Sequence, residues 1–129
     1  MTQKTRNIVG WALTGLVALA FIASASMKLM GGEEMEKNAA LMGLTADSLK
    51  TIGILELVCI VLFIFPRTGV LGTLLVAAYL GGAIVTHLEH GQPFIAPVVI
   101  QCITWIAAVI RFPELLKRIS MPSIPKEAI

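Results

Sequence analysis

The stretch IGILELVCIVLFIFP, residues 52–66, decides the fold class, because it is almost entirely apolar and yet contains one carboxylate, Glu56. The rest of the 129-residue sequence has the same character: 57% of the residues are hydrophobic, 14% are charged, and the mean hydropathy is +0.86. An ordinary soluble domain is about a quarter charged and at most about half apolar. A chain this short cannot bury so much apolar surface in a soluble core, so its composition predicts an integral membrane protein.

Three further stretches contain no Asp, Glu, Lys or Arg: residues 8–27, 68–86 and 91–110. Each provides the roughly 20 residues that a helix needs to cross a hydrocarbon core of about 30 Å. The stretch that contains Glu56 reaches a similar length if its helix begins after Thr45, a residue type that favours N-caps, and ends at Pro66. None of these stretches alternates apolar and polar residues as a barrel strand does, so we predict helices.

The predicted fold is therefore all-α: one membrane domain, residues 1–129, that forms an integral four-helix bundle. We expect spans at approximately residues 8–30, 46–65, 68–87 and 93–110, and a cytoplasmic tail at residues 111–129. The very short connections after the second and third spans make consecutive helices antiparallel neighbours. The longer first connection, residues 31–44, has glycines near both ends and predicts a short surface helix.

The distribution of Lys and Arg predicts how the spans are oriented. With four spans, both ends of the chain and the second connection lie on the same side of the membrane. That side holds seven of the ten basic residues: Lys4, Arg6, Arg67, Arg111, Lys117, Arg118 and Lys126. Cytoplasmic loops are enriched in Lys and Arg, so we expect a multi-pass protein of a bacterial inner membrane with both termini in the cytoplasm. Ala23-Ser24-Ala25 resembles a signal-peptide cleavage site, but the preceding apolar run is long for a signal peptide, so we expect a retained span.

Four polar residues are expected to converge in the outer half of the bundle: Lys28, Glu56, His87 and Gln101. Lys28 and His87 end the two spans that run outward, whereas Glu56 and Gln101 lie a few turns inside the two spans that run inward. Side chains lean toward the N-terminus of their own helix, which narrows the difference in depth. Ionisable residues inside a membrane are costly and usually mark functional sites. We therefore predict that these four residues form a ligand-binding site, and we assign no catalytic residue.

Other interpretations of the polar residues stay open at this point. An ion pair with Lys28, a protonated carboxyl or a wet cavity would each spare Glu56 the cost of burial. The four residues could instead cross-link the helices by hydrogen bonds and bind nothing. The segment THLEHGQP, residues 86–93, brings His87, Glu89 and His90 together, but this spacing fits no zinc signature, and we predict no metal site.

Three segments resemble the DoxX-like family of membrane proteins: TGLVALAFIASASMKLMGG (residues 14–32), LMGLTADSLKTIGILELVCIVLFIFPRTGVLG (41–72) and AYLGGAIVTHLEHGQPF (78–94). The resemblance covers roughly residues 8–112, and its motifs are diffuse singly but specific in combination. It implies a four-helix membrane fold, and it assigns family positions to Lys28, Glu56 and His87 but not to Gln101. Broader relatives include a subunit of a thiosulfate:quinone oxidoreductase, membrane partners of redox and thiol-handling systems, and a eukaryotic protein that assists receptor assembly.

The leading functional hypothesis is a bacterial inner-membrane protein that binds a small molecule, a quinone or another lipophile, as an accessory subunit of a redox system. A converging set of Glu, His and Lys offers the proton partners that a quinone headgroup needs. The expected partners are the lipid bilayer, the lipophilic ligand, a redox protein and further copies of the chain. Nucleic acid and a covalently bound cofactor are not expected. Two alternatives stay open, namely a proton-coupled small-molecule transporter and a non-catalytic membrane assembly factor, and so does the question whether the protein is an enzyme.

Overall fold

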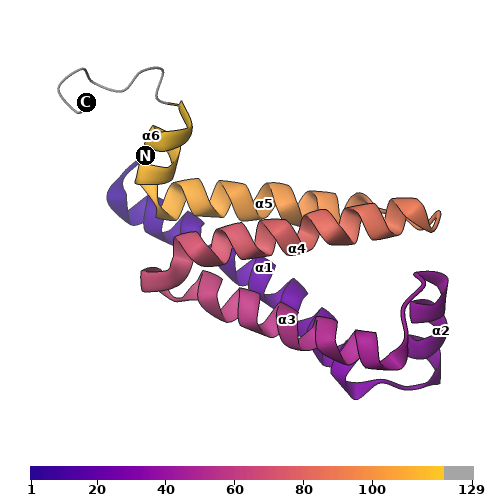
Figure 1. Ribbon diagram of the computed structural model, residues 1–129. Coiled ribbons are helices and arrows are strands. Elements are labelled where there is room, and N and C mark those ends of the chain that lie inside the picture. Colours follow the sequence, from indigo (N-terminus) through magenta and orange to yellow (C-terminus); the bar gives the residue numbers. More distant parts are fainter. Residues whose placement is uncertain (121–129) are drawn as a thin grey trace, which may run out of the picture.

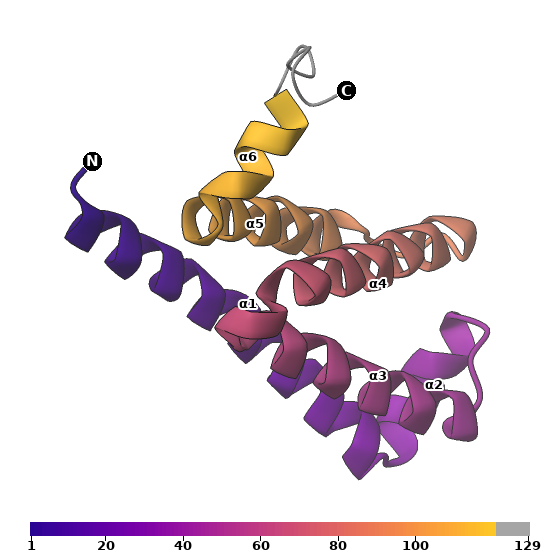
Figure 2. The same ribbon diagram turned by 60° about the vertical axis from the view of Figure 1, so that its left-hand side comes forward.

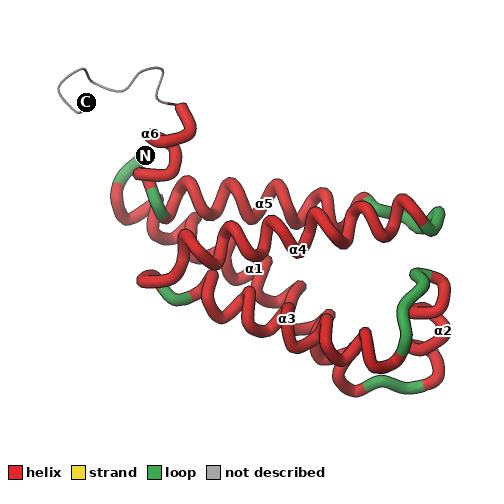
Figure 3. The backbone as a smooth tube through the Cα atoms, viewed as in Figure 1, coloured by secondary structure: helices red, strands yellow, loops and turns green. Residues whose placement is uncertain are grey.

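The structure, a computed structural model, describes residues 1–120, and these residues form helices without any strand (Figures 1 and 3). The elements are α1 (Gln3–Met30), α2 (Glu33–Leu41), α3 (Ala46–Ile64), the 3-10 turn η1 (Pro66–Thr68), α4 (Gly69–Glu89), α5 (Ile95–Arg111) and α6 (Pro113–Ser120). The predicted all-α class is confirmed for the described residues. Residues 121–129 of the predicted tail, with Lys126, lie outside them.

Four long helices contact one another around a closed cycle, because α1 and α4 each contact both α3 and α5. Figures 1 and 2 show that α1 runs beside α3 and that α4 runs beside α5. The two pairs lie close together at the end that carries the N-terminus and α6. They diverge toward the opposite end, where α2 lies. This divergence positions the cavity described below.

Local sequence signals account for the helix ends. Thr45 caps α3 as predicted, since its hydroxyl accepts a hydrogen bond from the backbone N–H of Ser48 at 3.1 Å. Pro66, which lacks an N–H, follows directly after the last turn of α3. Gly43 has a φ of +70°, a conformation that suits glycine, and it ends the short helix α2. The predicted surface helix in the first connection is therefore present as α2.

The apolar core lies where the two helix pairs are close, and its members are Val17, Ala18, Phe21, Cys59, Ile60, Phe63, Val76, Leu80 and Ala107. Gly72 lets α3 and α4 approach closely, because a Cβ there would lie 2.2 Å from the backbone nitrogen of Phe63. The buried residues of α4 all lie between Gly69 and Leu80. A Cβ at Gly81 or Gly82 would meet nothing within 4 Å, because the pairs have diverged there.

Arg111 links three helices at the end of the molecule that carries the N-terminus and α6 (Figure 1). Its guanidinium donates hydrogen bonds to the carbonyl oxygens of Phe63 at 2.8 Å and Ile64 at 3.0 Å. Those carbonyls end α3 and lack partners within that helix. The guanidinium carbon also lies 4.4 Å from the ring centroid of Trp11 on α1, within the range of a cation–π interaction. Arg111, which entered the sequence analysis only as a topology charge, thus joins α1, α3 and α5.

Two described helical segments are long and apolar enough to cross a membrane, Gln3–Met30 and Pro66–Glu89. A third results if Ile95–Arg111 and Pro113–Ser120, which are bent by 104° at their junction, count as one span. By itself α5 has 17 residues, and α3 carries Asp47, Lys50 and Glu56 within its 19 residues. The apolar helices support a membrane protein, and the assignment of four spans stays a prediction.

Candidate functional site

Glu56 lies at the centre of a buried hydrogen-bond cluster that joins α1, α3 and α4. Its Oε1 accepts hydrogen bonds from the ammonium of Lys28 at 2.8 Å and from the hydroxyl of Ser24 at 2.9 Å. The hydroxyl of Tyr79 donates to the same oxygen, and Lys28 also donates to Ser24. We call Ser24, Lys28, Glu56 and Tyr79 the Glu56 cluster. Of the arrangements considered for Glu56, the structure shows the ion pair with Lys28.

Close contact between α1 and α3 brings the cluster together. A Cβ at Gly53 would lie 3.3 Å from the backbone oxygen of Ala25 and 3.1 Å from Leu29, so glycine lets the two helices approach. Glu56 follows Gly53 by three residues and therefore lies on the same face of α3. Ser24 and Lys28 are four residues apart and share one face of α1. The absence of a side chain at Gly53 thus allows the carboxylate to reach both Ser24 and Lys28.

The two oxygens of Glu56 have very different surroundings. Only 2% of the residue is exposed, and all the hydrogen bonds that the described residues give it end on Oε1. Oε2 is buried and has no hydrogen-bond partner among the described residues. A buried carboxylate oxygen without a donor is costly, and in native proteins it calls for an explanation such as a bound molecule. The free oxygen therefore indicates a place for a ligand or water.

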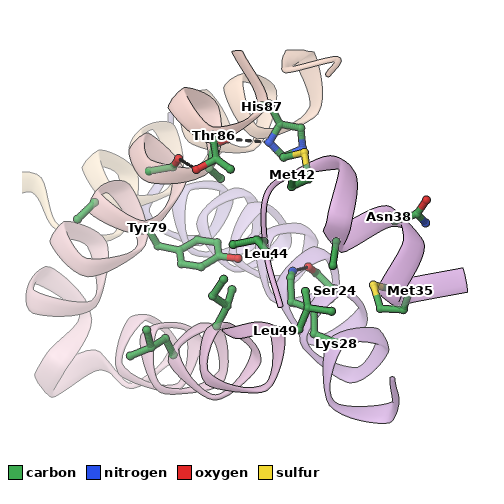
Figure 4. A pocket seen from close by; sticks show the side chains of 16 residues that line it. Ser24, Lys28, Met35, Asn38, Met42, Leu44, Leu49, Tyr79, Thr86 and His87 are labelled. Atoms are coloured by element: carbon green, nitrogen blue, oxygen red, sulfur yellow. Dashed lines mark hydrogen bonds between the residues drawn. The ribbon is translucent and has the colours of Figure 1, made fainter. Parts of the chain in front are cut away.

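A cavity of about 510 Å³ lies beside the cluster, between α1, α2, α3 and α4. Figure 4 shows its polar side chains: Ser24 and Lys28 come from α1, and Tyr79 extends toward them from α4. Met35 and Asn38 belong to α2 and Met42 follows its last residue, so this short helix covers one side of the cavity. Most of the remaining lining is apolar. Such a cavity, with a few convergent polar groups, is typical of small-molecule sites.

A second cavity of about 150 Å³ lies between α1, α4 and α5 and is lined by Glu56. The two cavities share five lining residues: Ser24, Lys28, Tyr79, Ala83 and His87. The polar groups therefore form the boundary between a large and a small compartment.

His87 joins this boundary from the last turns of α4. Its Nδ1 lies 2.6 Å from the backbone oxygen of Ala83, and because a carbonyl only accepts, Nδ1 carries the proton. Nε2 makes no hydrogen bond to a described residue, and it can accept one when it carries no proton. The structure thus brings together three of the four predicted site residues: Lys28, Glu56 and His87.

Gln101 lies apart from the other predicted site residues. Its amide nitrogen donates to the backbone oxygen of Ala77 at 3.1 Å, and its side chain lines neither cavity. In the structure it therefore links α5 to α4. The sequence argument concerned only depth along the helix, and depth does not determine which face of α5 meets α4.

Ser24 and Tyr79 belong to the cluster, but the sequence analysis did not select them as site residues. Tyr79 is the single tyrosine of the chain, and it lies in the middle of an apolar run. A buried tyrosine hydroxyl usually finds a hydrogen-bond partner, and this rule could have connected it to Glu56. Ser24 precedes Lys28 by one helical turn, which is a weaker signal because small hydroxyl residues are common at membrane helix contacts.

No curated protein and no solved structure matches this chain. A comparison with protein families matches residues 12–109 to the DoxX-like family, and the match includes the whole Glu56 cluster and His87. Because the matched residues cover most of the 129-residue sequence, the chain belongs to the DoxX-like family.

Proposed function

We propose that α1, α3, α4 and α5 all cross a bacterial inner membrane as a four-helix bundle with both termini in the cytoplasm. The closed cycle of contacts among these helices supports this proposal. Each helix also exposes large apolar side chains that lipid would cover, such as Leu19, Ile54, Leu74 and Ile106. The charges of α3 agree with a span, since Asp47 and Lys50 lie in its first turns and Glu56 is paired.

Within this bundle, the protein binds a small lipophile, a quinone or a molecule of similar size, and serves as an accessory subunit of a redox system. One observation carries this proposal: a largely apolar cavity of about 510 Å³ is lined by Ser24, Lys28 and Tyr79 of the Glu56 cluster. Glu56 itself, whose Oε2 has no partner among the described residues, lines the adjoining cavity of about 150 Å³. The larger cavity lies within the usual range of ligand sites, about 300–1,000 Å³. Lys28, Tyr79 and His87 supply polar groups at the cavity wall for the ligand's head.

Mass spectrometry of the purified protein in native lipid discs tests the proposal. We expect one lipophile to be enriched over the bulk membrane lipids, and Glu56→Gln to lose it. Gln101→Leu is the matched control, because Gln101 is a partly buried amide that lines neither cavity. A ligand retained by the control and lost by Glu56→Gln supports binding at the cluster. Bulk lipid alone in all three samples would refute the proposal.

A non-catalytic assembly factor is the second candidate, and a different feature of the same cluster favours it. The hydrogen bonds of Glu56 join α1, α3 and α4, which is what a purely structural cross-link would do. In that case Glu56→Gln lowers the melting temperature and the yield of folded protein, and no enriched lipophile is found in the wild type.

A further inference from the structure

We propose that the site selects lipophiles whose ring-shaped head carries a hydroxyl donor, as in phenols and hydroquinones, over rings that carry only ketone or ether oxygens. This inference rests on the proposed function and narrows it: of the two redox states of a quinone, the site favours the reduced hydroquinone. Three features support the inference. Most hydrogen-bond donors in the cavity wall already bond to protein atoms, some acceptors there have no donor, and the smaller cavity has the size of one ring.

The hydroxyl and imidazole donors at the cavity wall are already used within the protein. The single hydroxyl hydrogens of Ser24 and Tyr79 both point at Glu56 Oε1. Thr86 donates to the backbone oxygen of Gly82 at 2.8 Å, and His87 uses its Nδ1–H on Ala83. A ligand that only accepts hydrogen bonds therefore finds few free donors among these residues.

The free groups at the boundary of the two cavities are mostly acceptors. Glu56 Oε2 has no donor among the described residues, and Nε2 of His87, which can accept when it carries no proton, has none either. Lys28 has three N–H groups and uses two of them, on Ser24 and Glu56, which leaves one. A ligand hydroxyl can donate to the carboxylate and accept from Lys28, whereas a ketone or ether oxygen can only accept.

The smaller cavity has the size of one aromatic ring. Its volume is about 150 Å³, and an apolar protein cavity of about this volume binds benzene. Phe21, Leu80, Pro97 and Ile100 provide apolar walls for such a ring, and Glu56 and His87 line the same cavity. The adjoining cavity of about 510 Å³ is large enough to take an apolar chain attached to the ring.

The test compares 4-octylphenol with its methyl ether, 4-octylanisole, in which a methyl group replaces the hydroxyl hydrogen and removes the donor. Binding to the purified protein in lipid discs is measured by calorimetric titration, with empty discs subtracted to remove partition into lipid. We expect the phenol to bind the wild type at least about tenfold more tightly, because a hydrogen bond to a charged acceptor contributes more than a neutral one. Gln101→Leu should keep this ratio.

Glu56→Gln should change which of the two probes binds more tightly, and not only weaken binding. Three donors converge on the Oε1 position, so the glutamine carbonyl takes that position and its NH₂ group takes the position of Oε2. This replaces a free acceptor with a donor, and the preference for the phenol should disappear or reverse. Equal binding of both probes by the wild type would overturn the hydroxyl rule and leave the binding function standing. Binding of neither probe above empty discs would overturn the binding function as well.

Discussion

Replacing Lys28 with methionine should cost the protein much of its stability, because it removes the cation from a buried ion pair. Lys28 Nζ lies 2.8 Å from Glu56 Oε1, and only 3% of the glutamate side chain is exposed. Leaving one member of a buried pair without its partner typically costs about 3–5 kcal/mol. Because 18% of the lysine side chain is exposed, we expect Lys28→Met to lie near the lower limit of that range.

Removing the other member of the pair, by Glu56→Gln, should lower the free energy of unfolding less. Without the carboxylate, Lys28 can move its ammonium toward the lipid headgroups. We expect about 1–2 kcal/mol for Glu56→Gln, because the amide keeps an oxygen for Ser24 and Tyr79. The double variant leaves no buried charge and should cost about as much as Glu56→Gln alone. The two single effects are therefore expected to exceed the double effect by about 2–3 kcal/mol, the coupling of the pair.

The assay is a double-mutant cycle. Unfolding of the wild type and the three variants is followed by circular dichroism in mixed micelles as the fraction of denaturing detergent rises. Gln101→Leu serves as a control outside the pair, and it should add to Lys28→Met without coupling. A coupling between Lys28 and Glu56 below about 0.5 kcal/mol would mean that the charges are solvated, and it would refute the buried ion pair.

Three further predictions concern other parts of the structure. Arg111→Met should lower the free energy of unfolding by about 2–3 kcal/mol, because two carbonyls at the end of α3 lose a charged donor, and Arg6→Met at the same end should cost far less. Gly72→Val should prevent folding, since its Cβ would overlap the backbone of Phe63, whereas Gly81→Ala, with open space, should keep the wild-type melting temperature. A spin label at position 119 on α6 should be accessible to oxygen and one at position 118 to a water-soluble relaxant, if α6, bent by 104° from α5, lies on the membrane surface.

Each of these measurements has a clear opposing result. Equal stability of Arg111→Met and Arg6→Met would remove the role of Arg111 as a cap of α3. A folded Gly72→Val protein would mean that α3 and α4 are farther apart than described. Equal relaxation of both spin labels by the water-soluble reagent would place α6 in the aqueous phase.

Composition and local signals were sufficient to predict the four long helices and α2, but not α6, which lies in the segment predicted only as a tail. The uncharged runs, the cap at Thr45 and the stop at Pro66 depend only on neighbouring residues, so these features follow directly from the chain. The prediction of a small helix between the glycines of the first connection was right for the same reason. Lys28, Glu56 and His87 were also found from sequence, because an ionisable residue in an apolar run is conspicuous wherever the helix lies.

The partners of these residues were decided by the tertiary structure. Depth along a helix follows from residue number, but the face that meets a neighbour depends on how the helices rotate and cross, and that is set by contacts such as Gly53 with α1 and Gly72 with α3. For this reason Gln101 donates a hydrogen bond to the backbone oxygen of Ala77, whereas Tyr79 donates one to Glu56. The cavity likewise exists because the helix pairs diverge beyond Leu80. This divergence depends on contacts between all four helices, so it cannot be predicted from any one segment of the sequence.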